Sequence, residues 1–156
     1  MHDDLLNLLR RFQENGVQYI LVGGHAVRLN GFVRATEDID VLVPFDPING
    51  ARVIKSLEFL PSAREMDPHW FSKEANAEEI ENIRVADRIL IDILFAAAGE
   101  TYESLQPHVV ELEVDGVRIR TLNIDGLRKT KQTNREKDLI DRHALEALQK
   151  AAGSVP

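Results

Sequence analysis

Three aspartates of this chain occur inside apolar runs that are typical of β-strands. Asp38 and Asp40 are separated only by Ile39, in the run at residues 38–43. Alternate residues of a strand point to the same face, so both carboxylates should project from one side of a sheet. Carboxylates placed in this way can hold a pair of divalent cations, which in two-metal sites lie about 3.5–4 Å apart. The pair therefore predicts metal-dependent chemistry.

Asp92 is the only acidic residue in the apolar run at residues 88–95. Burying a lone carboxylate is costly unless a cation, hydrogen-bond donors or a metal compensates for it. Two interpretations are open: an aspartate bonded to backbone amides at a strand end, or a third metal ligand beside Asp38 and Asp40. In the second case Asp92 could also accept the proton of an attacking hydroxyl. The nearby acidic pair favours the metal site.

Gly23 and Gly24 end the apolar run that begins at Tyr19. Glycine allows a backbone to approach a phosphate closely, and a helix that follows would direct its first amide groups at that anion. Residues 19–43 therefore combine a predicted phosphate-binding turn with a predicted metal-binding strand. This combination indicates a nucleotide site.

Hydrophobic spacing predicts the elements that must position these residues. Helices are expected at 5–12, 25–30 and 48–60, and in the tail from residue 124. Strands are expected at 18–22, 39–43, 80–85, 88–95, 109–114 and 117–122. The third and fourth strands should be joined by a tight turn at Ala86 and Asp87, and the last two by a hairpin turn at Asp115-Gly116. Residues 68–76 should be a loop with a short extended piece at Trp70 and Phe71. These aromatics could stack a base or an acceptor, although packing in or beside the core is favoured.

The order of these elements predicts an α/β (α+β) fold, in which helices flank a mixed β-sheet. A chain of 156 residues is long enough to bury a core and is typical of one domain. We therefore expect a single domain over residues 1–156, with its core at about 17–122 and a C-terminal helical segment at about 124–152.

Composition excludes several classes of protein. The chain has no cysteine, which excludes disulfides and zinc–thiolate sites. No apolar run is long enough to span a bilayer, and the N-terminus does not resemble a secretory signal, so a cytoplasmic location without membrane association is expected. A net charge of −7 disfavours broad DNA binding. Basic residues do gather at 118–137, where a polyanion could bind.

The glycine pair, thirteen intervening residues, Asp38-Ile-Asp40-Val41 and the later Asp92 together resemble a known pattern. They look like the nucleotidyltransferase fold of the DNA polymerase beta superfamily. The finer sequence, Gly23-Gly-His-Ala followed by Arg34-Ala-Thr36-Glu-Asp38, is similar to the AbiEii-type minimal nucleotidyltransferases, which include toxins of toxin–antitoxin and defence systems. It is also similar to small antibiotic nucleotidyltransferases, although this chain has little room for their extra acceptor domain.

The resemblance implies transfer of a nucleoside monophosphate from a nucleoside triphosphate to an acceptor hydroxyl. It implies two Mg²⁺ ions, with Mn²⁺ as a substitute, held by the catalytic residues Asp38, Asp40 and Asp92. The nucleotide would be bound by Gly23, Gly24, Arg34, Thr36 and Lys131.

The acceptor stays open between an RNA end, a protein and a small molecule. The basic segment leans towards a polyanion such as tRNA, but it could equally serve the triphosphate alone. A homodimer or a cognate antitoxin is a further expected partner. The alternative function is a non-catalytic nucleotide-binding or partner-binding module on the same fold, similar to an antitoxin. Mg²⁺-dependent release of pyrophosphate separates the two functions.

Overall fold

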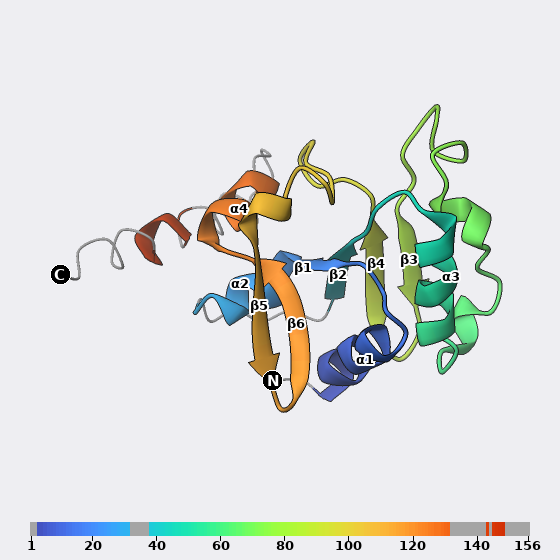
Figure 1. Cartoon of the computed structure of the whole chain (residues 1–156), viewed down its shortest axis with the longest axis horizontal. Coiled ribbons are helices and arrows are strands. Elements are labelled where there is room, and N and C mark those ends of the chain that lie inside the picture. The colour runs from blue at the N-terminus through green and yellow to red at the C-terminus, as the bar shows by residue number, and fades with distance from the viewer. Residues whose placement is uncertain (1–2, 32–37, 132–142, 144, 149–156) are drawn as a thin grey trace.

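The computed structural model describes residues 3–31, 38–131, 143 and 145–148. Within this part of the chain the strands form one mixed sheet in the order β3-β4-β2-β1-β6-β5, with helices packed against it (Figure 1). The predicted α/β fold class is confirmed. The strands are β1 Ile20–Val22, β2 Asp38–Leu42, β3 Ile83–Ala86, β4 Leu90–Leu94, β5 Val109–Val114 and β6 Val117–Leu122. The α-helices are α1 Asp3–Glu14, α2 Gly23–Leu29, α3 Pro47–Ser56 and α4 Ile124–Thr130, and the 3-10 helices are η1 Pro61–Ala63, η2 Pro68–Phe71 and η3 Gln106–His108.

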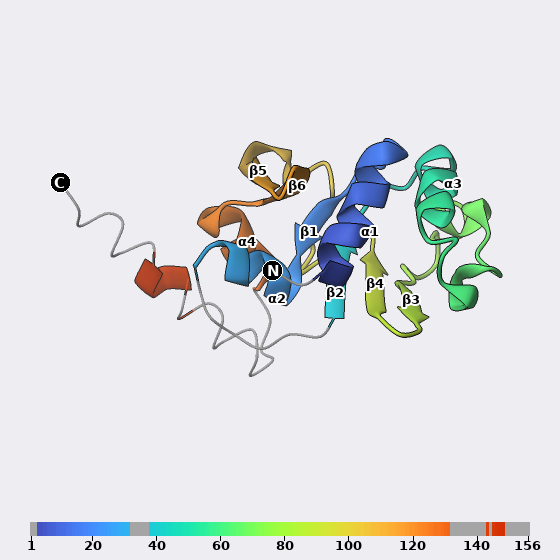
Figure 2. The same cartoon turned by 90° about the horizontal axis from the view of Figure 1, so that it is seen from below.

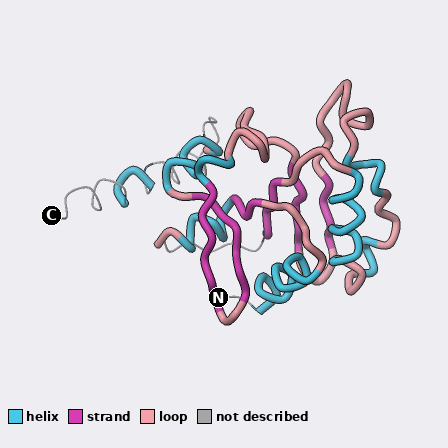
Figure 3. The backbone as a smooth tube through the Cα atoms, in the orientation of Figure 1, coloured by secondary structure: helices cyan, strands magenta, loops and turns pink. Residues whose placement is uncertain are grey.

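Both directions of strand pairing occur in the sheet. The pairs β1–β2, β3–β4 and β5–β6 are antiparallel, whereas β2–β4 and β1–β6 are parallel. A parallel pair needs a crossover connection, and the one between β2 and β4 contains α3, η1, η2 and β3. Seen from below, α1 lies against the sheet beside α3, while α2 and α4 lie together near the far end of β1 (Figure 2). The tube view shows the same division between the central strands and the helices around them (Figure 3).

The core is built from the apolar faces that the sequence indicated. In α1, Leu5, Leu8, Leu9 and Phe12 are fully buried, as their helical spacing predicts. In the hairpin of β5 and β6, the predicted turn at Asp115-Gly116 is confirmed. Both of its residues have positive φ angles, 50° and 79°, as a two-residue hairpin turn requires.

Aromatic rings fix the crossover segment on the sheet. The ring of Phe95 stacks on Phe45 at 4.8 Å between centroids and meets the edge of Phe71 at 5.6 Å. Phe71 is fully buried and presses against Gly50, where an added Cβ would lie 2.5 Å from the ring. The absence of a side chain at Gly50 therefore lets η2 pack closely on α3.

Three of the expected elements were wrong in detail. The helix expected at 48–60 ends at Ser56, with Leu57 as its C-cap. The extended piece expected at Trp70 and Phe71 is the 3-10 helix η2, because the side chain of Asp67 accepts a hydrogen bond from the His69 amide and Pro68 occupies its first turn. The glycine pair is not a loop before a helix but the first turn of α2 itself.

The turn between β3 and β4 was also wrong. Ala86 pairs with Leu90, so the loop consists of residues 87–89 rather than of Ala86 and Asp87. A separate result concerns the helices: none in the described part of the chain combines the length and the apolar character needed to cross a lipid bilayer.

Candidate active site

The three aspartates lie together at the centre of the sheet. Strands β2 and β4 run parallel in a register that places Asp40 beside Asp92. Asp38, two residues before Asp40, shares its face of β2. Two strands that are far apart in sequence therefore present three carboxylates to one place.

The carboxylates open into a cavity of about 480 Å³, which we call the carboxylate cavity. The side chains of Asp38 and Asp92 are 35% and 20% exposed, so both reach solvent through it. The walls come from β1, β2, β4 and the loop after β4. Asn82 just before β3, Arg84 within β3, and the end of α4 complete them. The lining residues are Val22, Gly23, Asp38, Asp40, Asn82, Arg84, Asp92, Leu94, Ala96, Ala97, Ala98, Thr130 and Lys131.

Asp40 bears the strongest electrostatic perturbation of the site. Burial is the main cause that raises its pKa, to about 7, and the negative charge of Asp92 and a hydrogen bond to that side chain add to the rise. The charge of Asp38 acts in the same direction, whereas Lys131 opposes it. Among the described residues, the carboxylates around Asp40 therefore outweigh the lysine that opposes them, a condition that favours a bound cation.

Gly23 is placed where no side chain could fit. Its φ is +72°, and an added Cβ would overlap the carboxylate of Asp40. The glycine therefore gives Asp40 room to project into the cavity, in addition to exposing backbone to it. Gly24 is buried in the first turn of α2 and does not line the cavity. Of the two predicted phosphate-binding glycines, Gly23 lines the described part of the cavity and Gly24 does not.

Arg84 holds Asp92 and was not among the predicted site residues. Its Nη1 donates to both carboxylate oxygens of Asp92 at 3.1 Å and lies 3.8 Å from Asp38. The interpretation of Asp92 as an aspartate satisfied by backbone amides is therefore wrong, because a side-chain cation is its partner. Arg84 reaches Asp92 from the neighbouring antiparallel strand, where the two residues pair directly.

The hairpin explains why this contact was missed. A two-residue turn at Ala86 and Asp87 would set Arg84 opposite Ile89. The actual three-residue loop moves the pairing partner to Asp92. A shift of three positions also exchanges the two faces of a strand. The expected strand register therefore separated Arg84 from Asp92. The available signal in the sequence was one arginine in β3 and one aspartate in β4.

Lys131 also lines the carboxylate cavity. It is only 6% exposed and is close enough to Asp40 to lower its pKa. It follows α4, which begins at the cap formed by Asn123, whose side chain accepts from the Gly126 amide at 2.9 Å. Thr130, just before Lys131, also lines the cavity, and its hydroxyl donates to the Leu127 carbonyl at 2.7 Å. This lysine is therefore positioned to meet an anion in the cavity.

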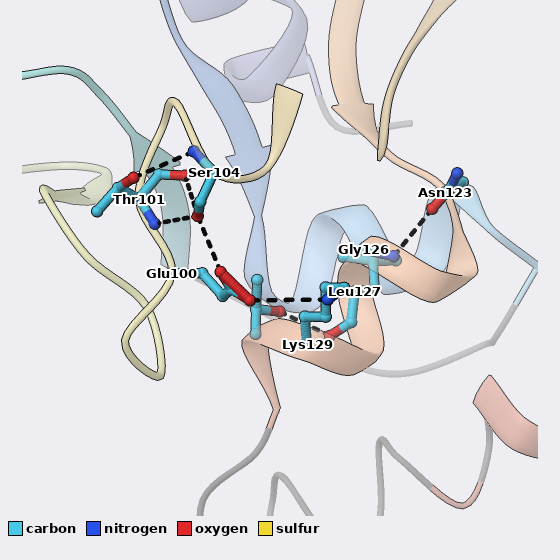
Figure 4. Close-up of polar contacts among 8 residues, drawn as sticks. Glu100, Thr101, Ser104, Asn123, Gly126, Leu127 and Lys129 are labelled. Carbon is cyan, nitrogen blue, oxygen red and sulfur yellow. Dashed lines mark hydrogen bonds and ion pairs between the residues drawn. The ribbon is translucent and has the colours of Figure 1, made fainter. Parts of the chain in front are cut away.

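The loop after β4 is tied to α4 (Figure 4). Glu100 accepts a hydrogen bond from Ser104 at 2.8 Å and forms an ion pair with Lys129 at 3.9 Å. The turn just before it has Ala98 at φ 51° and Gly99 at φ 80°. A non-glycine residue in the left-handed region is strained, and such strain gathers at ligand sites. The loop that carries the lining residues Ala96, Ala97 and Ala98 is thus fixed to α4, the helix that precedes Lys131.

The structure describes only some of the other predicted residues. Arg34 and Thr36 fall outside the described residues. Phe71 belongs to the core, as the packing interpretation held, whereas Trp70 is 42% exposed.

The residues of the carboxylate cavity fit a divalent cation of the magnesium class. Mg²⁺ prefers oxygen ligands and retains part of its water shell, so a few converging carboxylates suffice. Among the residues that the structure describes, no three acidic or histidine side chains are already arranged around a common ion position. Arg84 and the hydrogen bond between Asp40 and Asp92 account for this arrangement, because each engages an oxygen that an ion would use.

Comparison with known proteins supports the fold. No protein-family model matches the sequence, and no curated protein matches it significantly. The structure resembles the crystal structure of a "putative nucleotidyltransferase" from Thermotoga maritima, with a TM-score of 0.56 and 16% sequence identity. The match covers 97% of this chain and 92% of the other. At this identity the likeness concerns the fold, which is nucleotidyltransferase-like.

Proposed function

We propose that this protein is a metal-dependent nucleotidyltransferase, which transfers a nucleoside monophosphate from a nucleoside triphosphate to an acceptor hydroxyl. The observation that carries the proposal is the convergence of Asp38, Asp40 and Asp92, from two parallel strands, on one cavity that Lys131 also lines. Three carboxylates facing a buried lysine suit a ligand that is itself a metal–polyphosphate. The likeness in fold to the Thermotoga maritima protein is consistent with this chemistry.

Each residue has a role in the proposed reaction. Asp38, Asp40 and Asp92 would hold two Mg²⁺ ions, with Mn²⁺ as a substitute. The bound metal supplies positive charge for the triphosphate and for the oxygens that enter and leave the α-phosphorus. Lys131 binds the phosphates, and Gly23 presents backbone to them without a side chain that would block Asp40.

The bond changes follow from this placement. The acceptor oxygen forms a bond to the α-phosphorus, and the bond from that phosphorus to the bridging oxygen of the β-phosphate breaks, which releases pyrophosphate. The proton of the acceptor hydroxyl passes to a carboxylate oxygen of Asp92. Arg84 must release that oxygen first, since its Nη1 donates to both oxygens of Asp92.

The narrower assignment to the AbiEii-type branch, with toxin–antitoxin or defence as its role, rests on the sequence motif around the glycines and Asp38. It carries with it a cognate antitoxin or a homodimer as partner. Gly24, Arg34 and Thr36 belong to this motif as further nucleotide-binding residues. The proposal includes this branch, its partners and these three residues.

One observation favours a second candidate, a non-catalytic nucleotide-binding or partner-binding module. Arg84 already supplies Asp92 with a positive charge, so part of the site is satisfied without a metal. Such a module would bind a nucleotide without releasing pyrophosphate. Turnover therefore decides between the two.

The first prediction concerns turnover. Wild-type protein, given Mg²⁺, each of four nucleoside triphosphates labelled at the α-phosphate, and separate RNA, protein and small-molecule fractions, should release pyrophosphate and label one fraction. Asp40→Asn and Asp92→Asn should each reduce this release by at least about 100-fold, because removing one electrostatic group of such a site costs about 10²–10³ in rate. Asp115→Asn, in a hairpin turn where asparagine tolerates the positive φ, is the matched control.

Nucleotide binding without any Mg²⁺-dependent release in the wild type would replace the first candidate with the second. Equal release by Asp92→Asn and wild type would remove Asp92 from the site.

A further inference from the structure

A second cavity adjoins the carboxylate cavity. Its volume is about 420 Å³, and it shares two wall residues, Asn82 and Arg84, with the first cavity. Its lining residues are Trp70, Ala75, Asn76, Glu81, Asn82, Ile83 and Arg84. We call it the tryptophan cavity. Small-molecule sites commonly have volumes of about 300–1,000 Å³. A molecule in this cavity would therefore lie directly beside the three carboxylates.

The tryptophan cavity is held in shape by a buried side chain. Asn76 is 8% exposed, and its Nδ2 donates to the carbonyls of Trp70 at 3.1 Å and Ser72 at 2.8 Å. Its Oδ1 accepts from the Glu81 amide at 3.0 Å. One residue thus joins the end of η2 to the segment that enters β3. A preformed wall of this kind lowers the ordering cost of binding.

An exposed ring is the main apolar feature of this wall. Trp70 is 42% exposed although it sits on η2 next to the fully buried Phe71. Indole is the best aromatic partner for a cation above its face, and it also stacks on flat rings. The cavity therefore offers a binding surface for a molecule that has a ring, a positive charge or both.

The charge around the ring selects between these partners. Glu81 lines the cavity, and Glu74, Glu78 and Glu79 are exposed in the same segment at 72–82, against the single basic residue Lys73. Among the described residues, Arg84 is the one basic residue that lines this cavity, and its guanidinium is held by Asp92 and Asp38. A polyanion would meet uncompensated like charge here, whereas a cation would be attracted.

The basic segment does not offer a compensating track for nucleic acid within the described residues. Arg120 pairs with Glu111 at 2.7 Å, Arg128 with Glu146 at 3.3 Å, and Lys129 with Glu100 at 3.9 Å. The charge of Lys131 lowers the pKa of Asp40 in the carboxylate cavity, where this lysine would bind a triphosphate. Four of the described basic residues of this segment therefore serve internal pairs or the nucleotide, which leaves the exposed Arg118 as one charge rather than a track.

We infer that the tryptophan cavity is the acceptor site of the proposed transfer, and that its acceptor is a hydroxyl-bearing small molecule with a flat ring and a positive charge. The inference rests on the proposed function for the identity of the reaction. Trp70 covers the ring of the acceptor, Glu81 faces its cation, and the shared wall at Asn82 and Arg84 delivers its hydroxyl to the carboxylates.

The chain supplies its own reporter, because Trp70 is its single tryptophan. Three probes share a phenyl ring and a hydroxyl and differ in charge: phenylalaninol is cationic, 3-phenyl-1-propanol is neutral and 3-phenyllactate is anionic. Each is titrated into the wild-type protein while the tryptophan emission is recorded. Phenylalaninol should give the tightest saturable change and 3-phenyllactate the weakest. Glu81→Gln should weaken phenylalaninol by about two- to fivefold, as an exposed ion pair implies, and leave 3-phenyl-1-propanol unchanged.

Glu113→Gln, on the opposite edge strand of the sheet, is the matched control and should change neither titration. Trp70→Leu, followed by calorimetry in place of fluorescence, should lose most of the phenylalaninol binding. Equal affinities for the three probes, or no saturable response to any, would overturn the inference. Stronger binding of a short oligoadenylate than of phenylalaninol would do the same and assign the cavity to an RNA end.

Binding of a Mg²⁺–nucleotide is measured by calorimetry on the same preparation. Nucleotide binding without a charge preference among the probes defeats the acceptor assignment alone. Failure of the nucleotide to bind defeats the proposed function, whatever the probes do.

Discussion

At the scale of single residues, the site is organised by the competition for Asp92. Arg84 holds both of its oxygens, and Asp40 shares a hydrogen bond with the same side chain. The side chain of Arg84 is 52% exposed, so solvent screens its ion pair and limits the strength of the contact. A divalent cation of higher charge and closer approach should therefore displace it. On this view Arg84 is a replaceable counter-ion.

The second prediction tests this competition through metal affinity. Arg84→Gln should bind Mn²⁺ about two- to fivefold more tightly than the wild type, because the metal no longer displaces an exposed ion pair. Binding is followed by the loss of the free Mn²⁺ signal in electron paramagnetic resonance. Arg88→Gln is the control, since Arg88 lies on the same hairpin but pairs with Asp4 at 3.3 Å. Weaker or equal Mn²⁺ binding by Arg84→Gln would show that the arginine does not compete.

At the scale of elements, close packing of η2 on α3 sets the position of the exposed tryptophan. The ring of Phe71 fills the space left free at Gly50, and it is fixed on its other side by Phe95. Trp70 precedes Phe71 directly, so the position of the buried phenylalanine ring determines where the exposed tryptophan ring lies. The shape of the tryptophan cavity therefore depends on a glycine in the middle of a helix.

The third prediction weighs two opposing effects at Gly50. Alanine in place of glycine favours a helix by about 1 kcal/mol. Its Cβ would lie 2.5 Å from the ring of Phe71, and overpacking of this kind costs about 1–3 kcal/mol. Gly50→Ala should therefore lower the free energy of unfolding in urea, by up to about 2 kcal/mol.

A double-mutant cycle checks the cause. In the background of Phe71→Leu, the substitution Gly50→Ala should cost less or become stabilising. The same loss in both backgrounds would place the strain elsewhere.

The elements show which parts of the fold follow from local sequence. The apolar spacing of α1 and the Asp115-Gly116 turn predicted their elements well, because each signal lies within a few consecutive residues. The 3-10 helix η2 has too few residues to show a period. The loop at residues 87–89 lacks a glycine that would mark it. Its misplacement changed the register of β3 and so concealed the contact of Arg84 with Asp92.

The candidate site followed the same rule. The two aspartates of β2 could be placed on one face from their spacing alone. The position of Asp92 beside Asp40 depends on a parallel pairing, which no local pattern specifies. The tryptophan cavity depends on a buried asparagine that contacts three separate backbone groups. Such contacts are set by tertiary structure and have no signature in sequence.

At the scale of the whole molecule, the site reduces stability in the absence of a cation. The fourth prediction follows from Asp40, whose pKa rises from its ordinary value of 3.8 to about 7 in the folded protein. Between these pH values the native state retains a proton that the unfolded state has lost. The free energy of unfolding should therefore fall as the pH rises from about 4 to about 7, by roughly 2–4 kcal/mol from this group.

Asp40→Asn cannot ionise, so it should be more stable than the wild type at pH 8 and similar to it near pH 4. The difference between the two proteins, measured by urea unfolding in the presence of a chelator, isolates this group from the other carboxylates. Curves that stay parallel from pH 4 to pH 8 would contradict the assignment. Adding Mg²⁺ at pH 8 should restore stability to the wild type alone.

The parallel pairing of β1 with β6 has a consequence for how the protein is made. The hydroxyl of Thr121 donates to the carbonyl of Leu21, a contact between residues 100 positions apart. By contrast, all three carboxylates belong to residues 38–92. On a ribosome, the segment that binds the metal is complete while the strand β6 and Lys131 are still unsynthesised. The nascent chain should thus pass through a stage that has the three carboxylates of the site but lacks the lysine that opposes them. Closing the loop between β1 and β6 should be the slow step of folding.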